Sequence, residues 1–233
     1  MATVKRILCL ANSKKMSGRC VAGRVVTAAG AGPWVRPVSA RATEEVSEYE
    51  RQYPDGSDPR VLDVVDITLL AHRPHACQTE NWLLDPEAYW QKVRRVGWVE
   101  LKKYVENPQT LWLNAGSTYV GLNDEIPQQQ ADALPGSLCL ICVSSVELHV
   151  SAPNTAFGNA KRRVQARFRH NDVWYWLWVT DPLIERNYLA RPDGTYSLGE
   201  CCLTVSLGEP FQKQGQWYRY KLVAAIIERS ELV

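Results

Sequence analysis

The segment 162–180 constrains the fold most, because it contains two runs that alternate between polar and apolar residues on either side of a short turn. Such alternation is typical of strands that bury one face. Asn171 and Asp172 tolerate the positive φ angles of a two-residue turn, so we predict a hairpin centred on them. The turn fixes the register, since a slip of one residue would exchange the two faces.

The predicted register gives the hairpin two different faces. The apolar face is expected to point to the core, and it pairs Phe168 with Tyr175, Ala166 with Leu177, and Val164 with Val179. The opposite face pairs Arg169 with Trp174, Arg167 with Trp176, Gln165 with Trp178, and Arg163 with Thr180. An arginine beside an indole ring allows a cation–π contact of about 0.5–2 kcal/mol.

The arginine–tryptophan face has two interpretations. As a ligand surface, the indoles would stack on bases and the guanidinium groups would pair with phosphates. As a packing surface, the tryptophans would lie under the N-terminal half of the chain, in the seam between two domains, with the arginines at the rim. The sequence leaves both interpretations open.

Composition limits the remaining possibilities. A chain of 233 residues, nearly half of them hydrophobic, suffices for one large globular domain or two small ones. The net charge of +2 gives no bulk attraction to nucleic acid, so any basic surface must be local. No apolar run reaches the roughly 20 residues of a membrane span, and residues 7–10 are too few for a signal-peptide core. We therefore expect a cytoplasmic protein with no membrane partner.

The seven cysteines are an odd number, and most of them lie in apolar runs. This pattern favours buried free thiols in a reducing compartment over a disulfide framework.

The order of predicted elements indicates the fold. The first third contains strand-like runs, and Asp85-Pro86-Glu87 is typical of a helix start, so we predict a helical insertion over about 82–106. The last hundred residues contain five predicted strands with a short helix between the third and fourth, at 138–150, 162–169, 173–180, 202–207 and 218–228. That order matches an OB-fold, a small partly open barrel.

We accordingly predict a mainly β chain built from two OB-like five-stranded barrels packed together. The first domain is expected to span residues 1–136 and to carry the helical insertion. The second is expected to span residues 137–233.

The N-terminal half offers two further candidate contacts. Residues 13–19 combine Lys14, Lys15 and Arg19 with hydroxyl groups and a glycine, so their backbone could form an anion-binding nest. The spacing of these residues is not that of a phosphate-binding P-loop. A solvated hairpin tip would explain the same cluster of basic and polar residues equally well. Trp34 and Arg36 stand at i and i+2, on one face of a strand, and repeat the tryptophan–arginine theme.

Metal and catalytic motifs are weak. Cys139 and Cys142 stand three apart on a predicted strand, so their side chains point to opposite faces, and no second pair follows at zinc-finger spacing. We therefore predict neither a metal nor a cofactor. Asp181 and Glu185 could be paired carboxylates at the start of a helix, although the helix dipole alone would favour acidic residues there.

Four segments together resemble one family: LCLANSKKMSGRCVAG, GPWVRPVS, WLWVTDPLIE, and SLGEPF with YKLVAAIIE. They are similar to the dual OB-containing domain family, a bacterial group, and the resemblance runs from about residue 7 to 228. It implies two OB-like barrels in one unit, found alone or beside nucleic-acid enzymes, repair or defence components, and it transfers no catalytic residue. The helical middle departs from a plain two-barrel pattern.

The sequence thus favours a nucleic-acid-binding module, with single-stranded DNA or RNA as its partner. The candidate contact residues are Lys14, Lys15, Arg19, Trp34, Arg36, Arg163, Arg167, Arg169, Trp174 and Trp176. One alternative is an accessory subunit that binds a partner protein or a small nucleotide. Another is a nucleotide-processing enzyme that uses Asp181 and Glu185.

Overall fold

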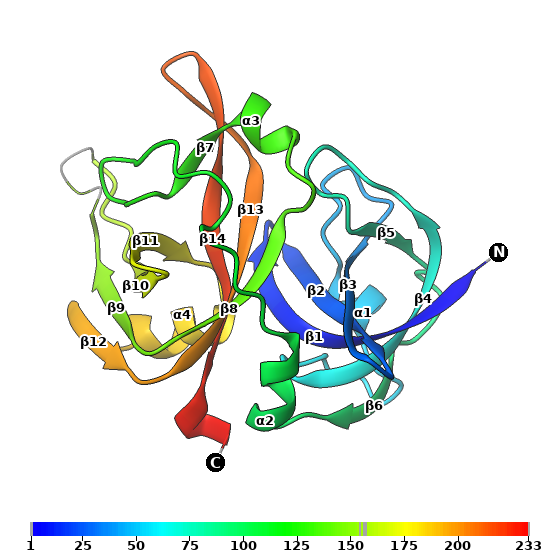
Figure 1. The fold of residues 1–233 in the computed structure, drawn as a ribbon. Helices are drawn as coiled ribbons and strands as arrows, with labels where there is room; N and C mark the ends of the chain where they lie inside the picture. Colours follow the sequence, from blue (N-terminus) through cyan, green and yellow to red (C-terminus); the bar gives the residue numbers. More distant parts are fainter. Residues whose placement is uncertain (1, 154, 156–157, 233) are drawn as a thin grey trace. The chain divides into compact units, whose positions relative to one another are not determined.

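The computed structural model describes residues 2–153, 155 and 158–232, which form two compact units (Figure 1). The first comprises Met1–Val105 with Pro135–Ser137, and the second comprises Glu106–Leu134 with Leu138–Val233. This division differs from the boundary at 136–137 expected from the sequence. Residues 106–134 pack with the second unit because their backbone bonds to its strands, as Glu106 does to Leu140 and Leu122 to Trp176.

The first unit is a closed five-stranded barrel with one additional strand. Its elements are β1 (Thr3–Lys15), β2 (Gly18–Thr27), β3 (Gly30–Val38), α1 (Glu48–Arg51), β4 (Asp63–His72), β5 (Asn81–Leu84), β6 (Gln91–Arg95), α2 (Trp98–Leu101) and the 3-10 helix η1 (Lys102–Tyr104). Strands pair in the order β1-β2-β3-β5-β4, and β4 returns to β1. Strands β3 and β5 run parallel, whereas the other neighbours are antiparallel.

The predicted helical insertion at 82–106 is largely wrong. Most of this region consists of strands β5 and β6 and their turns, and only residues 98–104 are helical. The side chain of Asp85 accepts a hydrogen bond from the backbone of Glu87 in a turn and does not cap a helix. Strand β6 is exposed along its whole length and is held by pairing with β4.

The second unit repeats the same topology. Its elements are β7 (Glu125–Pro127), α3 (Gln128–Asp132), β8 (Leu138–Val143), β9 (Val146–Ser151), β10 (Arg163–His170), β11 (Val173–Val179), α4 (Pro182–Leu189), β12 (Gly194–Leu198), β13 (Cys201–Lys213), β14 (Gln216–Glu228) and the 3-10 helix η3 (Arg229–Leu232). Strands pair in the order β9-β10-β11-β14-β13-β8, with β11 and β14 parallel. Strands β8 and β9 are consecutive around a bend at Ser144 and Ser145, so they act as one first strand.

Both units therefore have a helix between the third and fourth barrel strands and a parallel pairing of the third with the fifth. The prediction of two OB-like barrels is confirmed. Each of the five segments expected as strands in the last hundred residues contains strand, but 138–150 divides into β8 and β9, and the additional strand β12 was not expected. In the second unit β13 and β14 extend past the barrel as a two-stranded arm (Figure 1).

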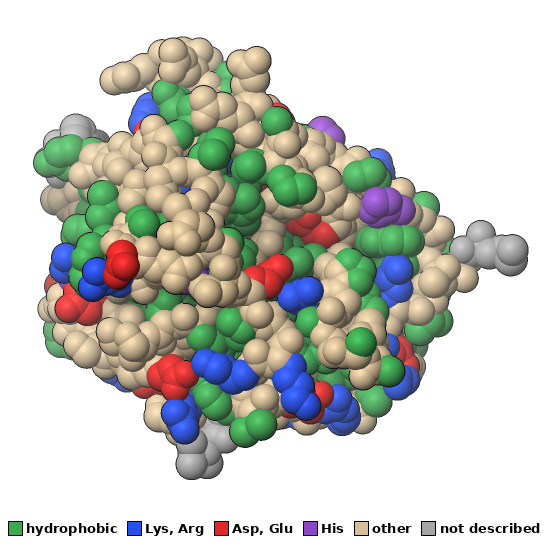
Figure 2. Space-filling view, viewed as in Figure 1, with side chains coloured by type: hydrophobic (Ala, Val, Ile, Leu, Met, Phe, Trp, Pro, Cys, Tyr) green, Lys and Arg blue, Asp and Glu red, His purple; other side chains and the backbone are tan. Residues whose placement is uncertain are grey.

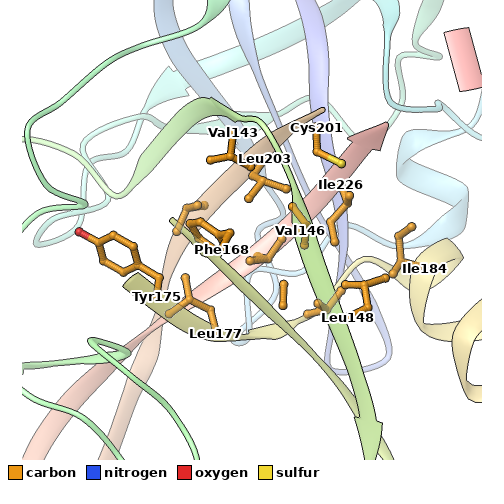
Figure 3. Close-up of a cluster of buried hydrophobic side chains, with 14 of the residues drawn as sticks. Val143, Val146, Leu148, Phe168, Tyr175, Leu177, Ile184, Cys201, Leu203 and Ile226 are labelled. Atoms are coloured by element: carbon orange, nitrogen blue, oxygen red, sulfur yellow. The ribbon is translucent and has the colours of Figure 1, made fainter. Parts of the chain in front are cut away.

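The apolar face of the predicted hairpin forms part of the core of the second unit (Figure 3). Phe168, Tyr175 and Leu177 are at most 1% exposed and pack with side chains from β8, β9, β13 and β14. The rings of Phe168 and Tyr175 are stacked with their centroids 5.6 Å apart. Burial of large side chains contributes about 1.5–3 kcal/mol each, so this core holds the hairpin in place.

One cysteine pair departs from the expectation of free thiols. Cys142 on β8 and Cys202 on β13 stand opposite one another and form a disulfide, with their Cα atoms 4.1 Å apart. Within the described residues the other cysteines form no disulfide, and all of them except the half-buried Cys20 are buried. The cross-strand register brings Cys142 and Cys202 together, and their spacing in the sequence does not reveal it.

Gly23 allows the backbones of the paired strands β1 and β2 to approach closely. A Cβ atom placed on it would lie 2.1 Å from the carbonyl oxygen of Leu8. We expect Gly23→Ala to destabilise the protein by about 1–3 kcal/mol, because backbone must move to admit the methyl group. The measurement is urea unfolding. Gly199→Ala serves as the control, since its nearest contact would be 3.9 Å away. Equal losses of stability in the two variants would contradict the steric account.

Candidate functional site

The β10–β11 hairpin has the predicted turn and register. Asn171 and Asp172 have φ angles of 45° and 67°, as a two-residue hairpin turn requires. The observed cross-strand pairs from Gln165 with Trp178 to His170 with Val173 agree with the prediction. The arginines and tryptophans therefore share the outer face of the barrel, opposite the core. We call this surface, formed by the outward side chains of β9, β10 and β11, the hairpin face.

The ring contacts on the hairpin face are diagonal. The guanidinium carbon of Arg167 lies 4.7 Å from the centroid of the Trp174 ring, and that of Arg163 lies 4.1 Å from the Trp178 ring. Each arginine thus stacks on an indole two residues away from its direct cross-strand partner. The long side chains lean along the strands, and diagonal neighbours are within their reach.

The three indoles differ in exposure. Trp174 is 42% exposed, Trp176 is half-buried and Trp178 is 5% exposed. Trp178 is covered because β11 pairs there with Leu222 of β14, and the backbone of Trp176 is bonded to Leu122. Trp174 lies near the turn, beyond these neighbours. The accessible aromatic surface is therefore at the turn end of the hairpin.

Acidic residues accompany most of the arginines on this face. Arg167 lies 3.4 Å from a carboxylate oxygen of Glu147, and Arg169 lies 2.7 Å from one of Asp172. Figure 2 shows basic, acidic and hydrophobic side chains intermixed around β9, β10 and β11, at the left of the view. Exposed ion pairs of this kind contribute only about 0–1 kcal/mol, so a phosphate could replace either carboxylate at little cost.

His149 on β9 extends the face and was not anticipated from the sequence. Its ring centroid lies 4.9 Å from that of Trp176. Burial lowers the pKa of His149 below its ordinary value, and the neighbouring Glu147 only partly opposes this effect. The imidazole is therefore neutral at pH 7 and adds a ring rather than a charge to the surface. Its position opposite Gln165 depends on the pairing of β9 with β10, which the local sequence does not reveal.

The arm carries a second aromatic row that the sequence interpretation also missed. Phe211 stacks on Tyr220 with centroids 3.8 Å apart, and Tyr218 lies 5.9 Å from Phe211. Tyr220 stands two residues before Leu222 on β14, so the two side chains lie on the same face of the strand. Leu222 pairs with Trp178, and the aromatic row of the arm therefore shares the outer face of the barrel. The alternation in QWYRY opposite EPFQK was the signal that could have revealed it.

The basic residues at 14–19 belong to the first unit and form the end of the β1–β2 hairpin. Lys14 is exposed, whereas Lys15 and Arg19 are half-buried. Lys14 pairs with Arg19, and the backbone of Arg19 is also bonded to Val46. The segment is thus an ordered hairpin end, and its contact with a ligand stays a prediction.

Arg36 is an internal residue of the first unit. It is 4% exposed, lies 3.0 Å from Glu80 and donates a 2.7 Å hydrogen bond to Ser137. On the same barrel face, Arg24 donates to the carbonyl of Tyr104 beside half-buried Trp34. The second and third strands of the first barrel are therefore partly covered by their own chain. We leave Trp34 and Arg36 out of the proposed ligand surface for this reason.

Asp181 has a structural role. One carboxylate oxygen accepts hydrogen bonds from the backbone of Leu183 and Ile184, which caps α4. The other oxygen accepts one from the backbone of Ile226 and ties the helix to β14. A carboxylate bonded in this way is poorly placed to act as a base. The proposal of an enzyme that uses Asp181 and Glu185 gains no support from this geometry.

Within the described residues, no group of three or more histidine, cysteine or acidic side chains could hold a metal ion. Cys139 packs in the core while Cys142 points to the other face of β8, as the strand argument predicted. None of the described helices has the length and apolar character needed to cross a membrane.

Comparison with known proteins identifies the family. A search of curated proteins and a search of solved structures find no match. The model of a family described as the dual OB-containing domain matches residues 5–226. OB-folds bind oligonucleotides and oligosaccharides through the face of their second and third strands and the adjoining loops. With nearly its whole length matched and two barrels of this topology, the chain belongs to the dual OB-containing domain family.

Proposed function

We propose that the chain is a nucleic-acid-binding module for single strands, and that the hairpin face of the second unit is the contact surface. The observation that carries this proposal is the pair formed by Trp174 and Arg167. The indole is 42% exposed, and the guanidinium stacked on it lies 4.7 Å away. Strands β10 and β11 are also the second and third strands of their barrel, where OB-folds take their ligands.

The chemistry of this surface suits a flexible strand. An exposed indole stacks on any base, and such stacking contributes about 1–3 kcal/mol per base. The arginines beside it supply positive charge for the phosphates between bases. A duplex hides the faces of its bases, so it would use the charges but not the ring. We therefore expect single strands to bind more tightly than duplexes of the same sequence.

Fluorescence anisotropy with labelled oligonucleotides tests this proposal. A 12-nucleotide oligo-dT or oligo-U is expected to bind more tightly than the matching duplex, with an affinity that falls as salt rises. The logarithmic salt slope should be about −0.7 for each phosphate contacted. Tighter binding of the duplex, or no binding of any strand at low salt, would contradict the proposal. Salt-insensitive binding of a mononucleotide would instead favour an accessory subunit for small nucleotides.

A further inference from the structure

Arg163 differs from the other arginines of the hairpin in its partners. Arg162 pairs with Asp193, Arg167 with Glu147, and Arg169 with Asp172. In the part of the chain that the structure describes, no hydrogen bond or ion pair reaches the guanidinium group of Arg163. The ring of Trp178 lies against this group, 4.1 Å from the guanidinium carbon.

The surroundings of Arg163 leave its charge only partly compensated. The residue is half-buried, and Trp178 beneath it is 5% exposed. Burial lowers the pKa of Arg163, while Glu185 and Tyr220 act in the opposite direction. Removing a cation from water without an anionic partner costs free energy, and a bound anion would recover it.

Arg163 lies where two rows of aromatic side chains meet: the tryptophans of β11 and the aromatic row of the arm. Trp178 pairs with Leu222 where β11 and β14 run side by side, and nearer the hairpin turn the two strands separate. There Leu122 bonds to Trp176, while β7 pairs with residues 218–220 of β14. The tryptophan row and the arm row are thus closest at the Trp178–Leu222 pair and diverge from it. Arg163 lies beside this pair, on the same outer face.

We propose that Arg163 is the phosphate anchor of the hairpin face, holding one phosphodiester of the bound strand between the two aromatic rows. This inference rests on the proposed function. A guanidinium group presents paired N–H donors that match two phosphate oxygens, and its stacking on Trp178 fixes the plane of that fork. At Arg167 and Arg169 a phosphate would only exchange one ion pair for another and so would gain little, whereas at Arg163 it would form a new pair.

The test compares two 12-nucleotide oligo-dT strands, one with phosphodiester linkages and one with uncharged methylphosphonate linkages. Wild-type protein is expected to prefer the charged strand. Arg163→Met should weaken binding of the charged strand about 10-fold and leave the uncharged strand nearly unchanged, and it should reduce the salt slope by about 0.7. Arg169→Met is the matched control. It removes an arginine that already has Asp172 as its partner, so it should cost less than about 3-fold.

The outcomes separate the two proposals. If wild-type protein binds neither strand, the proposed function fails and the phosphate anchor fails with it. If wild-type protein binds but Arg163→Met weakens both strands equally, or weakens neither, the anchor is overturned and the proposed function stands. Arg163→Lys retains the charge but lacks the paired donors and the planar stacking on Trp178, so it should keep only part of the preference for the charged strand. Equal losses in Arg163→Lys and Arg163→Met, with unchanged urea midpoints, would also overturn the anchor.

Discussion

Replacing Lys221 with methionine is expected to stabilise the folded protein by about 2–5 kcal/mol at pH 7. Lys221 lies on β14 with 0% of its surface exposed. Its ammonium group donates a 2.9 Å hydrogen bond to Asn114 and lies 5.3 Å from the ring of Tyr175. Burial lowers the pKa of Lys221 to about 7, and Asp124 only partly opposes the shift. Methionine fills a similar volume without a charge to desolvate.

The pH dependence of this gain follows from the direction of the pKa shift. In the unfolded chain Lys221 has its ordinary pKa of 10.5, so below about pH 7 it is protonated in both states and the full penalty applies. Between pH 7 and 10.5 the unfolded chain binds the proton and the folded protein does not, so the penalty falls as the pH rises. The advantage of Lys221→Met should therefore be largest at and below about pH 7 and nearly absent at pH 10.5.

Urea unfolding of the wild type and the variant at pH 7 and pH 10 measures the effect. Lys103→Met removes an exposed amine and should leave the stability unchanged at both pH values. A loss of stability in Lys221→Met at pH 7 would show that the bond to Asn114 outweighs the cost of burial. A gain of equal size at pH 7 and pH 10 would contradict the electrostatic explanation.

The second large effect concerns binding. The double variant Trp174→Ala/Trp176→Ala is expected to bind single strands about 100-fold more weakly, because each stacked base contributes about 1–3 kcal/mol. The salt slope should change little, since both substitutions remove rings and leave the arginines in place. Anisotropy titrations over a range of salt concentrations measure both quantities.

Trp217→Ala is the matched control for this variant. Trp217 is 50% exposed in the same unit, and it alternates with Tyr218 along β14, so it points away from the outer face. Its loss should leave binding nearly unchanged. Unaltered affinity in the double variant, with a urea midpoint close to that of the wild type, would remove the hairpin face from the site.

The sequence was most informative where the structure depends on near neighbours. The register of the hairpin follows from Asn171 and Asp172 and from the alternation on either side, and all of these lie within 18 residues. The element order of the second barrel followed for the same reason, because its strands are long and alternate clearly. A one-residue slip would have buried arginine and exposed phenylalanine, which left a single acceptable register.

The sequence was misleading where distant pairing decides the structure. Residues 91–95 are polar except for Val93 and lack alternation, yet they form β6 because they pair with the edge of β4. The tryptophans at 174 and 178 have the same local pattern, but only Trp178 is covered, since β14 pairs beside it. Arg36 matched the tryptophan–arginine theme, and its burial with Glu80 required contacts more than 40 residues apart in the sequence.

The most direct test of the central claim is photo-cross-linking of a 12-nucleotide strand that contains 5-iodouracil, followed by mass spectrometry of the peptides. We predict cross-links within residues 163–179, with Trp174 as the main site because it is the most exposed of the three indoles. The yield should fall sharply in the Trp174→Ala/Trp176→Ala variant. Cross-links confined to the first unit, for example to residues 14–19, would contradict the assignment of the ligand to the hairpin face.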